Sequence, residues 1–159
     1  MQERVVRVEG VLNARNLRFG VVASRFNDVI VDRLVSAAVD TLIEHGAEAA
    51  DIALVRVPGA FEIPLALSRL AASKRHDALI ALGCVIRGET PHFEYVAGEA
   101  ARGAGRVMTG HGIPVGFGIL TVDTVEQAID RAGAKAGNKG VDAALSAIEM
   151  ATLLRRLER

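Results

Sequence analysis

Four runs of mainly apolar residues recur along the chain, each bounded by polar or turn-forming residues. They cover residues 19–23, 52–57, 78–86 and 114–122. Such runs, with little alternation of apolar and polar positions, are typical of strands that are buried on both faces of a parallel sheet. We therefore expect four strands at the centre of the fold.

Segments with helical periodicity separate these runs, because their apolar residues recur every three or four positions. Thr124 and Gln127 form a capping-box pattern, which predicts the start of a short helix. Thr90 is expected at the N-cap of another helix, with Pro91 at its first position. The helices are expected over residues 28–45, 63–74, 92–109, from 124 onward, and 141–156.

The alternation of strands and helices predicts an α/β fold, namely a three-layer sandwich with a four-stranded parallel sheet between helices. Right-handed crossovers place every strand-to-helix turn at the same edge of such a sheet. The turns expected to meet there are residues 24–27, 58–62, 86–92 and 121–124.

The length of 159 residues fits a single domain, residues 1–159. Residues 1–16 are expected to form an N-terminal arm. Within it, residues 4–9 roughly alternate in polarity and have few local partners. Our hypothesis is that they add a strand to a neighbouring subunit's sheet.

Composition narrows the function classes. Nineteen basic residues balance nineteen acidic ones, so the chain has no net positive charge that would attract nucleic acid or anionic lipid. The N-terminal residues 1–10 contain no apolar core of signal-peptide length, and no apolar run reaches the length of a membrane span. Cys84 is the one cysteine, which fits a reducing compartment. A cytoplasmic protein is expected, and a mean hydropathy of +0.28 without tryptophan favours surface buried between subunits.

The turn at residues 86–92 carries the strongest candidate chemistry. A helix that starts directly after a buried strand presents unpaired N–H groups, which favour an anion. Gly88, Glu89 and Thr90 lie there, and His92 adds an imidazole that titrates near neutrality. This combination favours a catalytic site for a phosphorylated small molecule, although an ordinary helix cap with a surface histidine has the same residues.

Other candidate chemistry is less well supported. Cys84 lies inside an apolar strand, which raises the pKa of a thiol and disfavours a nucleophile activated by His92. Residues 133–140 are rich in glycine but lack the Gly-Lys-Ser/Thr ending of a P-loop. Taken alone, Phe117 is predicted to be a core residue and Arg131 an ordinary surface arginine. No set of residues has metal-ligand spacing.

Four short sequence motifs resemble those of the 6,7-dimethyl-8-ribityllumazine synthase family, and they occur in that family's order and spacing. The likeness runs from about Phe19 to Leu154. It implies a flavodoxin-like fold and the penultimate step of riboflavin synthesis, the condensation of 5-amino-6-(D-ribitylamino)uracil with 3,4-dihydroxy-2-butanone 4-phosphate, without cofactor or metal. The four motifs are ASRFN (residues 23–27), VPGAFEIP (57–64), RGETPHFEYV (87–96) and DRAGAKAGNKG (130–140).

The resemblance also implies roles for individual residues. His92 moves protons, Phe26 stacks on the pyrimidine and Glu62 accepts hydrogen bonds from the ribityl chain. Arg131 binds phosphate together with the turn that precedes His92, and Phe117 reaches a neighbouring subunit's site. The residues expected to bind substrate are Phe26, Ala60, Phe61, Glu62, Cys84, Val85, Ile86, Glu89, Thr90, Phe117, Arg131 and Lys139.

For assembly, the resemblance implies a pentameric ring with sites between subunits. The compact link at residues 133–138 favours members whose pentamers join into an icosahedral shell, with riboflavin synthase as a candidate partner. Two other classes share this layered fold. A flavodoxin-type electron carrier would usually have a Ser/Thr-rich loop after the first strand, where only Ser24 is present. A non-catalytic shell or lumazine-binding protein would be expected to lack His92 or Arg131.

Overall fold

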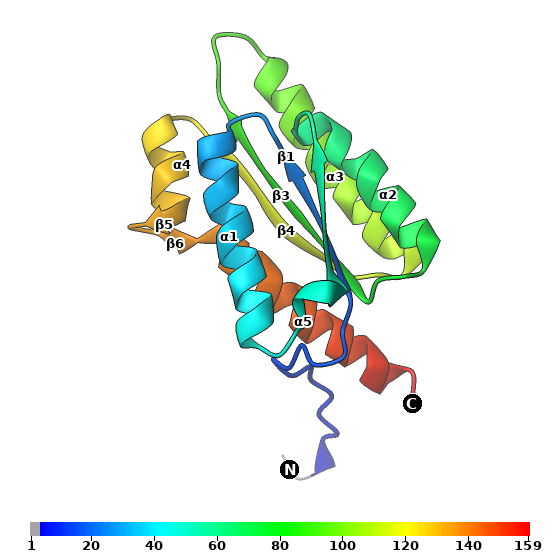
Figure 1. The fold of residues 1–159 in the computed structure, drawn as a ribbon. Coiled ribbons are helices and arrows are strands. Elements are labelled where there is room, and N and C mark those ends of the chain that lie inside the picture. Colours follow the sequence, from blue (N-terminus) through cyan, green and yellow to red (C-terminus); the bar gives the residue numbers. More distant parts are fainter. Residues whose placement is uncertain (1–3) are drawn as a thin grey trace.

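The computed structural model describes residues 4–159, and Figure 1 shows its helices packed on a central sheet. Strands and helices alternate along the chain up to β4, after which a small hairpin and a long helix complete the fold. In order, the elements are β1 Phe19–Ser24, α1 Asp28–Glu44, the 3-10 turn Ala49–Asp51, β2 Ile52–Val57, the 3-10 turn Ala60–Glu62, α2 Ile63–Ser73, β3 Ala78–Ile86, α3 His92–His111, β4 Val115–Val122, α4 Val125–Arg131, β5 Ala132–Ala134, β6 Gly137–Asn138 and α5 Lys139–Leu157.

The four main strands form one parallel sheet in the order β2-β1-β3-β4. Helices α1 and α5 pack on one face, and α2 and α3 pack on the other. The predicted three-layer α/β fold is confirmed, and each predicted strand agrees with the observed one to within a residue at either end. The connection after β1 leads toward one edge of the sheet, whereas the connection after β3 leads toward the other.

Two apolar layers, one on each face of the sheet, stabilise this arrangement. Phe19, Leu34 and Ile148 are fully buried between the sheet and the α1/α5 layer. Ile63 and Leu67 of α2 are fully buried on the opposite face. Burial of each such large side chain contributes about 1.5–3 kcal/mol. Because β1 and β3 pack against both layers, their residues are apolar on both faces, which explains their unbroken runs.

The start of α3 differs from the sequence prediction. The helix begins at His92, and Pro91 rather than Thr90 occupies the N-cap position, with no side chain capping the helix. The N–H of Glu94 donates to the carbonyl of Pro91 at 3.0 Å, which closes the first turn one residue late. The hydroxyl of Thr90 is therefore not used as a cap. By contrast, the predicted cap of α4 is confirmed, since the Gln127 N–H donates to Thr124 Oγ at 3.1 Å.

Two further segments were not predicted or differ from prediction. The hairpin formed by β5 and β6 was not expected, and its two short strands contain positive φ at Gly133 and Gly137. Residues 5–10 of the N-terminal arm form no strand within this chain, and the first three residues of the arm lie outside the described residues. Between residues 4 and 159, no helix is long and apolar enough to cross a membrane.

Gly103 allows helices α2 and α3 to pack closely. A Cβ added there would lie 2.5 Å from the Cβ and Cγ of Pro64, whereas one added at Gly110 of the same helix would meet nothing within 4 Å. We expect Gly103→Ala to destabilise the fold by about 1–3 kcal/mol through overpacking. Gly110→Ala should stabilise it by up to about 1 kcal/mol, because alanine is the better helix former.

Thermal denaturation of the two variants at equal protein concentration measures this difference. The melting temperature should fall for Gly103→Ala and rise for Gly110→Ala. Equal shifts in the same direction would contradict close packing at Gly103.

Candidate active site

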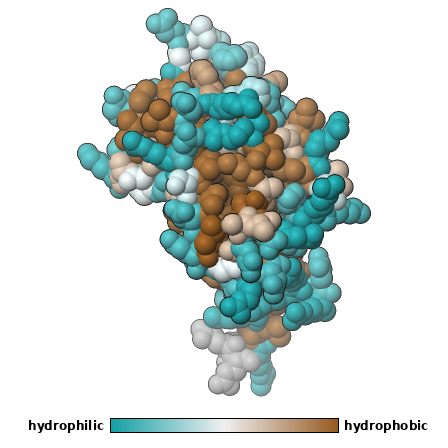
Figure 2. Space-filling view, viewed as in Figure 1, coloured by the Kyte–Doolittle hydropathy of each residue, from teal (hydrophilic) through white to brown (hydrophobic). Residues whose placement is uncertain are grey.

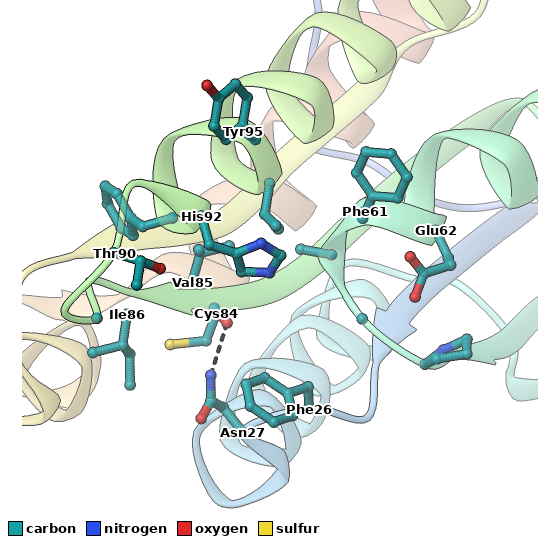
Figure 3. A pocket seen from close by; sticks show the side chains of 16 residues that line it. Phe26, Asn27, Phe61, Glu62, Cys84, Val85, Ile86, Thr90, His92 and Tyr95 are labelled. Atoms are coloured by element: carbon teal, nitrogen blue, oxygen red, sulfur yellow. Dashed lines mark hydrogen bonds between the residues drawn. The ribbon is translucent and has the colours of Figure 1, made fainter.

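A cavity of about 600 Å³ opens at the carboxyl ends of β1 and β3. These are the two neighbouring strands whose connections lead in opposite directions, and such a switch point is where open α/β sheets usually bind ligands. Figure 3 shows the lining residues. They are Phe26, Asn27, Pro58, Gly59, Ala60, Phe61, Glu62, Cys84, Val85, Ile86, Gly88, Thr90, His92, Phe93, Tyr95 and Val96.

The turn after β1 holds Phe26 at the cavity. The N–H of Arg25 donates to the carbonyl of Val57 at 2.8 Å, and that of Phe26 donates to the carbonyl of Pro58 at 3.0 Å. These bonds fix the turn against the neighbouring turn after β2. The ring of Phe26 is nevertheless 71% exposed, so its face is available to a planar ligand.

Asn27 lies beside Phe26 and was not among the predicted site residues. Its backbone is left-handed, with φ of 63° and ψ of 44°. Its Nδ2 donates to the carbonyl of Cys84 at 2.9 Å, which joins the end of β1 to the end of β3 across the cavity floor. An asparagine between a buried strand and a helix is a signal for such a left-handed position, because asparagine tolerates it better than most residues.

The turn after β2 supplies Ala60, Phe61 and Glu62 from one 3-10 turn. Ala60 is buried and Phe61 is exposed. A Cβ added at Gly59 would lie only 3.4 Å from Glu62 Oε1, so the carboxylate lies close against the glycine. Within the described chain the Glu62 carboxylate has no hydrogen-bond donor or ion-pair partner. Both oxygens are therefore free to accept hydrogen bonds from a polar ligand.

Cys84, Val85 and Ile86 form the floor of the cavity at the end of β3. The Cys84 side chain is only 3% exposed, and burial raises the pKa of its thiol to about 11. Near neutral pH the thiol therefore stays protonated, which makes it a poor nucleophile. This agrees with the expectation from the sequence that Cys84 is not a nucleophile activated by His92.

The raised pKa predicts slow alkylation of Cys84. At pH 8, a shift of the pKa from 9.0 to about 11 lowers the thiolate fraction on the order of 100-fold. Iodoacetamide should therefore modify the folded protein on the order of 100-fold more slowly than the same protein unfolded in urea. The test is mass spectrometry of the alkylated protein over time, and equal rates would contradict a buried neutral thiol.

His92 lies among the side chains that line the cavity. Figure 3 shows its imidazole among them, with Thr90 on the β3 side and Phe26 on the β1 side. The ring is exposed, and it makes no hydrogen bond within the described chain. Both ring nitrogens are thus free to exchange protons with a bound molecule. Since α3 has no side-chain cap, the N–H groups of His92 and Phe93 in its first turn also remain available to an anion.

Four predicted residues do not line this cavity. Glu89 is exposed in the turn beside it. Phe117 lies on the edge strand β4 and is 44% exposed, so the core prediction for it was wrong. Arg131 is partly buried, and its Nη1 donates to the carbonyl of Gln127 at 3.1 Å. Lys139 Nζ lies 4.0 Å from Asp142 on the same helix.

Comparison with known proteins agrees with this geometry. The model of the 6,7-dimethyl-8-ribityllumazine synthase family matches residues 16–155. The chain is also 54% identical over 153 residues to the 6,7-dimethyl-8-ribityllumazine synthase of Nitratidesulfovibrio vulgaris (strain DSM 19637 / Miyazaki F), a match that covers 96% of this chain and 98% of the relative. A match of this extent shows that the chain belongs to the 6,7-dimethyl-8-ribityllumazine synthase family.

Proposed function

We propose that the cavity at the ends of β1 and β3 is where this enzyme joins its two substrates, with His92 as the proton-transfer residue. The enzyme condenses 5-amino-6-(D-ribitylamino)uracil with 3,4-dihydroxy-2-butanone 4-phosphate in riboflavin biosynthesis. One observation carries the proposal: Phe26, Glu62 and His92, which come from three different turns, line the same cavity.

The pyrimidine substrate fits the β1 and β2 side of the cavity. Phe26 offers an exposed ring face on which a flat heterocycle stacks. The main chain at Val85 and Ile86 offers hydrogen bonds to the edge of the pyrimidine. The free carboxylate of Glu62 accepts hydrogen bonds from ribityl hydroxyls, and Ala60 and Phe61 bound the same side. These contacts hold the nucleophilic amine in a fixed orientation.

His92 serves the proton transfers of the reaction. The amine attacks the ketone and water leaves to give an imine, inorganic phosphate is lost by elimination, and a second loss of water accompanies ring closure. Each step moves a proton to or from nitrogen, oxygen or carbon, so a side chain that can both accept and donate a proton is suited to all of them. The imidazole of His92 is exposed and has no hydrogen-bond partner among residues 4–159. It is therefore free both to accept a proton from the substrate and to donate one to it.

The phosphate is held near the start of α3. The uncapped N–H groups there, together with the main-chain N–H groups of Glu89 and Thr90 in the turn, form one side of the proposed phosphate site. Arg131 supplies the positive charge, and Lys139 assists. In this structure Arg131 Nη1 donates to the carbonyl of Gln127, which leaves the other N–H groups of its guanidinium for phosphate, whereas Lys139 lies 4.0 Å from Asp142.

Arg131→Ala should weaken binding of the butanone phosphate and leave binding of the pyrimidine unchanged. A lost charge-assisted hydrogen bond costs roughly 1.5–3 kcal/mol, which raises the apparent KM about 10- to 150-fold. Steady-state kinetics with each substrate varied in turn measure this split. Inorganic phosphate should inhibit the parent enzyme much more strongly than the variant.

Arg156→Ala is the matched control, because Arg156 also donates to a main-chain carbonyl, that of Glu9 at 2.8 Å, far along the chain from the cavity. Its kinetics should equal those of the parent. Equal inhibition of parent and Arg131→Ala by phosphate would place the anion elsewhere.

The proposal extends to assembly as a pentameric ring. The edge strand β2 carries Leu54, which is 47% exposed, and Figure 2 shows apolar residues over the middle of the face where this edge lies. Val6 and Val8 of the N-terminal arm are also exposed. An arm that adds a strand to a neighbour's β2 would cover the exposed edge of β2 and the exposed valines of the arm.

Joining of pentamers into an icosahedral shell, with riboflavin synthase as a candidate occupant, belongs to the same proposal. Light scattering separates the outcomes, since a shell has megadalton mass and a lone pentamer does not. A cytoplasmic location is also proposed, because the one cysteine is free and buried, as is usual in reducing compartments.

A direct assay tests the activity as a whole. The purified enzyme is mixed with the two substrates, and formation of the lumazine is followed by its absorbance and by release of inorganic phosphate. Phosphate and lumazine should appear in equal amounts. Failure to form lumazine would favour the non-catalytic alternative, and flavin bound to the purified protein would favour the electron carrier.

A further inference from the structure

The turn that joins β3 to α3 has few contacts of its own. Gly88, Glu89 and Thr90 make no hydrogen bond within the part of the chain that the structure describes. A Cβ added at Gly88 would meet nothing within 4 Å. Among residues 4–159, the one side chain of the turn that makes a hydrogen bond or an ion pair is that of Arg87. Arg87 is therefore the residue that can hold the turn in place.

Arg87 contacts both sides of the turn. Its N–H donates to the carbonyl of Val122 at 2.9 Å, and its Nε donates to Asp123 Oδ1 at 2.8 Å. Its Cζ lies 4.7 Å from the centroid of the Phe93 ring. Phe93 directly follows His92 and packs against the core layer under α3. The guanidinium of Arg87 thus joins the end of β4 to the first turn of the helix that carries His92.

The contacts continue from Asp123 into helix α4. The N–H of Asp123 donates to Gln127 Oε1 at 2.7 Å, and the N–H of Gln127 donates to Thr124 Oγ at 3.1 Å. The carbonyl of Gln127 accepts from Arg131 Nη1 at 3.1 Å. An unbroken series of contacts therefore runs from the start of α3 through Arg87 to Arg131. The register of the sheet agrees with this, because the last residues of β3 and β4 are paired.

We propose that Arg87 is a positioning residue, which through its contacts with Asp123 and Phe93 fixes the place of His92 relative to Arg131. This inference rests on the proposed function, in which His92 moves protons and Arg131 holds the phosphate. Arginine suits the position because one edge of its planar group bonds a carboxylate while its face lies over a ring. A half-exposed ion pair adds little to stability, so its effect is expected in turnover rather than in the melting temperature.

Substitution of the two partners tests the proposal. Arg87→Gln and Asp123→Asn should each lower kcat about tenfold, within the roughly 100-fold range that misplacement of a catalytic group by about 1 Å costs. The KM for ribitylaminouracil should stay within about twofold of the parent value, because the contacts that bind the pyrimidine are untouched. The double variant should be no slower than either single variant, since the two residues act as one unit.

Asp123→Asn preserves the cap of α4, because that cap uses Thr124 Oγ, and the bond from residue 123 to Gln127 uses only the main-chain N–H. Arg155→Gln is the matched control. Arg155 is as exposed as Arg87 and pairs with a carboxylate, that of Asp77 at 3.5 Å, at the end of the sheet remote from the cavity. Its kcat should equal that of the parent.

Three outcomes would overturn the proposal. The first is a kcat for Arg87→Gln within about twofold of the parent. The second is a raised KM for the butanone phosphate in Arg87→Gln with no change in Asp123→Asn, which would make Arg87 a direct phosphate ligand. The third is multiplication of the two single effects in the double variant.

The His92→Ala background separates this proposal from the proposed function. If Arg87 acts by placing His92, then Arg87→Gln should slow His92→Ala no further. A further slowing of about tenfold would overturn the positioning role while leaving the role of His92 intact. Full activity of His92→Ala by itself would instead overturn the proposed role of His92.

Discussion

His92→Ala is expected to lower kcat by about 10²-fold while changing the KM of either substrate far less. General acid–base groups typically contribute 10²–10⁴-fold, and the lower part of that range is expected because the uncatalysed condensation is itself feasible. The substitution removes proton transfer but little contact area, since the imidazole is exposed and has no protein hydrogen bond among residues 4–159. Steady-state kinetics with each substrate varied at saturation of the other measure the effect.

The matched control is His111→Ala. His111 is the last residue of α3, the helix that His92 begins, and it is also exposed. Its replacement should leave kcat and both KM values at the parent level. An unchanged kcat in His92→Ala would remove the proton-transfer role, and a loss confined to KM would make His92 a binding group.

The fold was predictable because its sheet is buried on both faces. β1 and β3 are apolar at almost every position for that reason, and their boundaries follow from the sequence pattern. The strand order β2-β1-β3-β4 was not predicted, because every strand looks similar to its neighbours in the sequence. The order is determined by the faces that the connecting helices cover.

Local details were harder to predict where several weak preferences compete. Thr90 and Pro91 match the preferences for N-cap and first helical position, yet the helix starts one residue later. The β5–β6 hairpin has no apolar pattern, and its short strands contain positive φ at Gly133 and Gly137. Glycine alone does not distinguish such a hairpin from a loop.

The site was predictable in those parts that follow directly from the order of strands and turns along the chain. Phe26, Glu62 and His92 are brought together because parallel strands place their carboxyl ends at one edge. Asn27 was missed because its role depends on a backbone conformation and on a carbonyl of another strand. Nothing in the local sequence shows which carbonyl that is.

Activity is expected to require contact between subunits, and Phe117 is the residue that leads to this expectation. It lies on the edge strand β4, does not line the cavity of its own chain, and is 44% exposed. Beside it is a smaller apolar hollow of about 260 Å³, formed with α3. Head-to-tail contacts that present such a surface to the next subunit's site close naturally into rings. In a ring, each site would combine His92 of one subunit with Phe117 of the next.

Mixed oligomers test this arrangement directly. Phe117→Ala should lower the activity about 5- to 150-fold, since stacking of a base on an aromatic ring contributes about 1–3 kcal/mol. Subunits with His92→Ala and subunits with Phe117→Ala, refolded together at equal amounts, should recover activity because about a quarter of randomly assorted interfaces pair two intact residues. Ile43→Ala, an equally exposed residue on α1, is the control and should be fully active alone. A mixture no more active than the mean of its two components, or an active monomer by light scattering, would contradict a site shared between subunits.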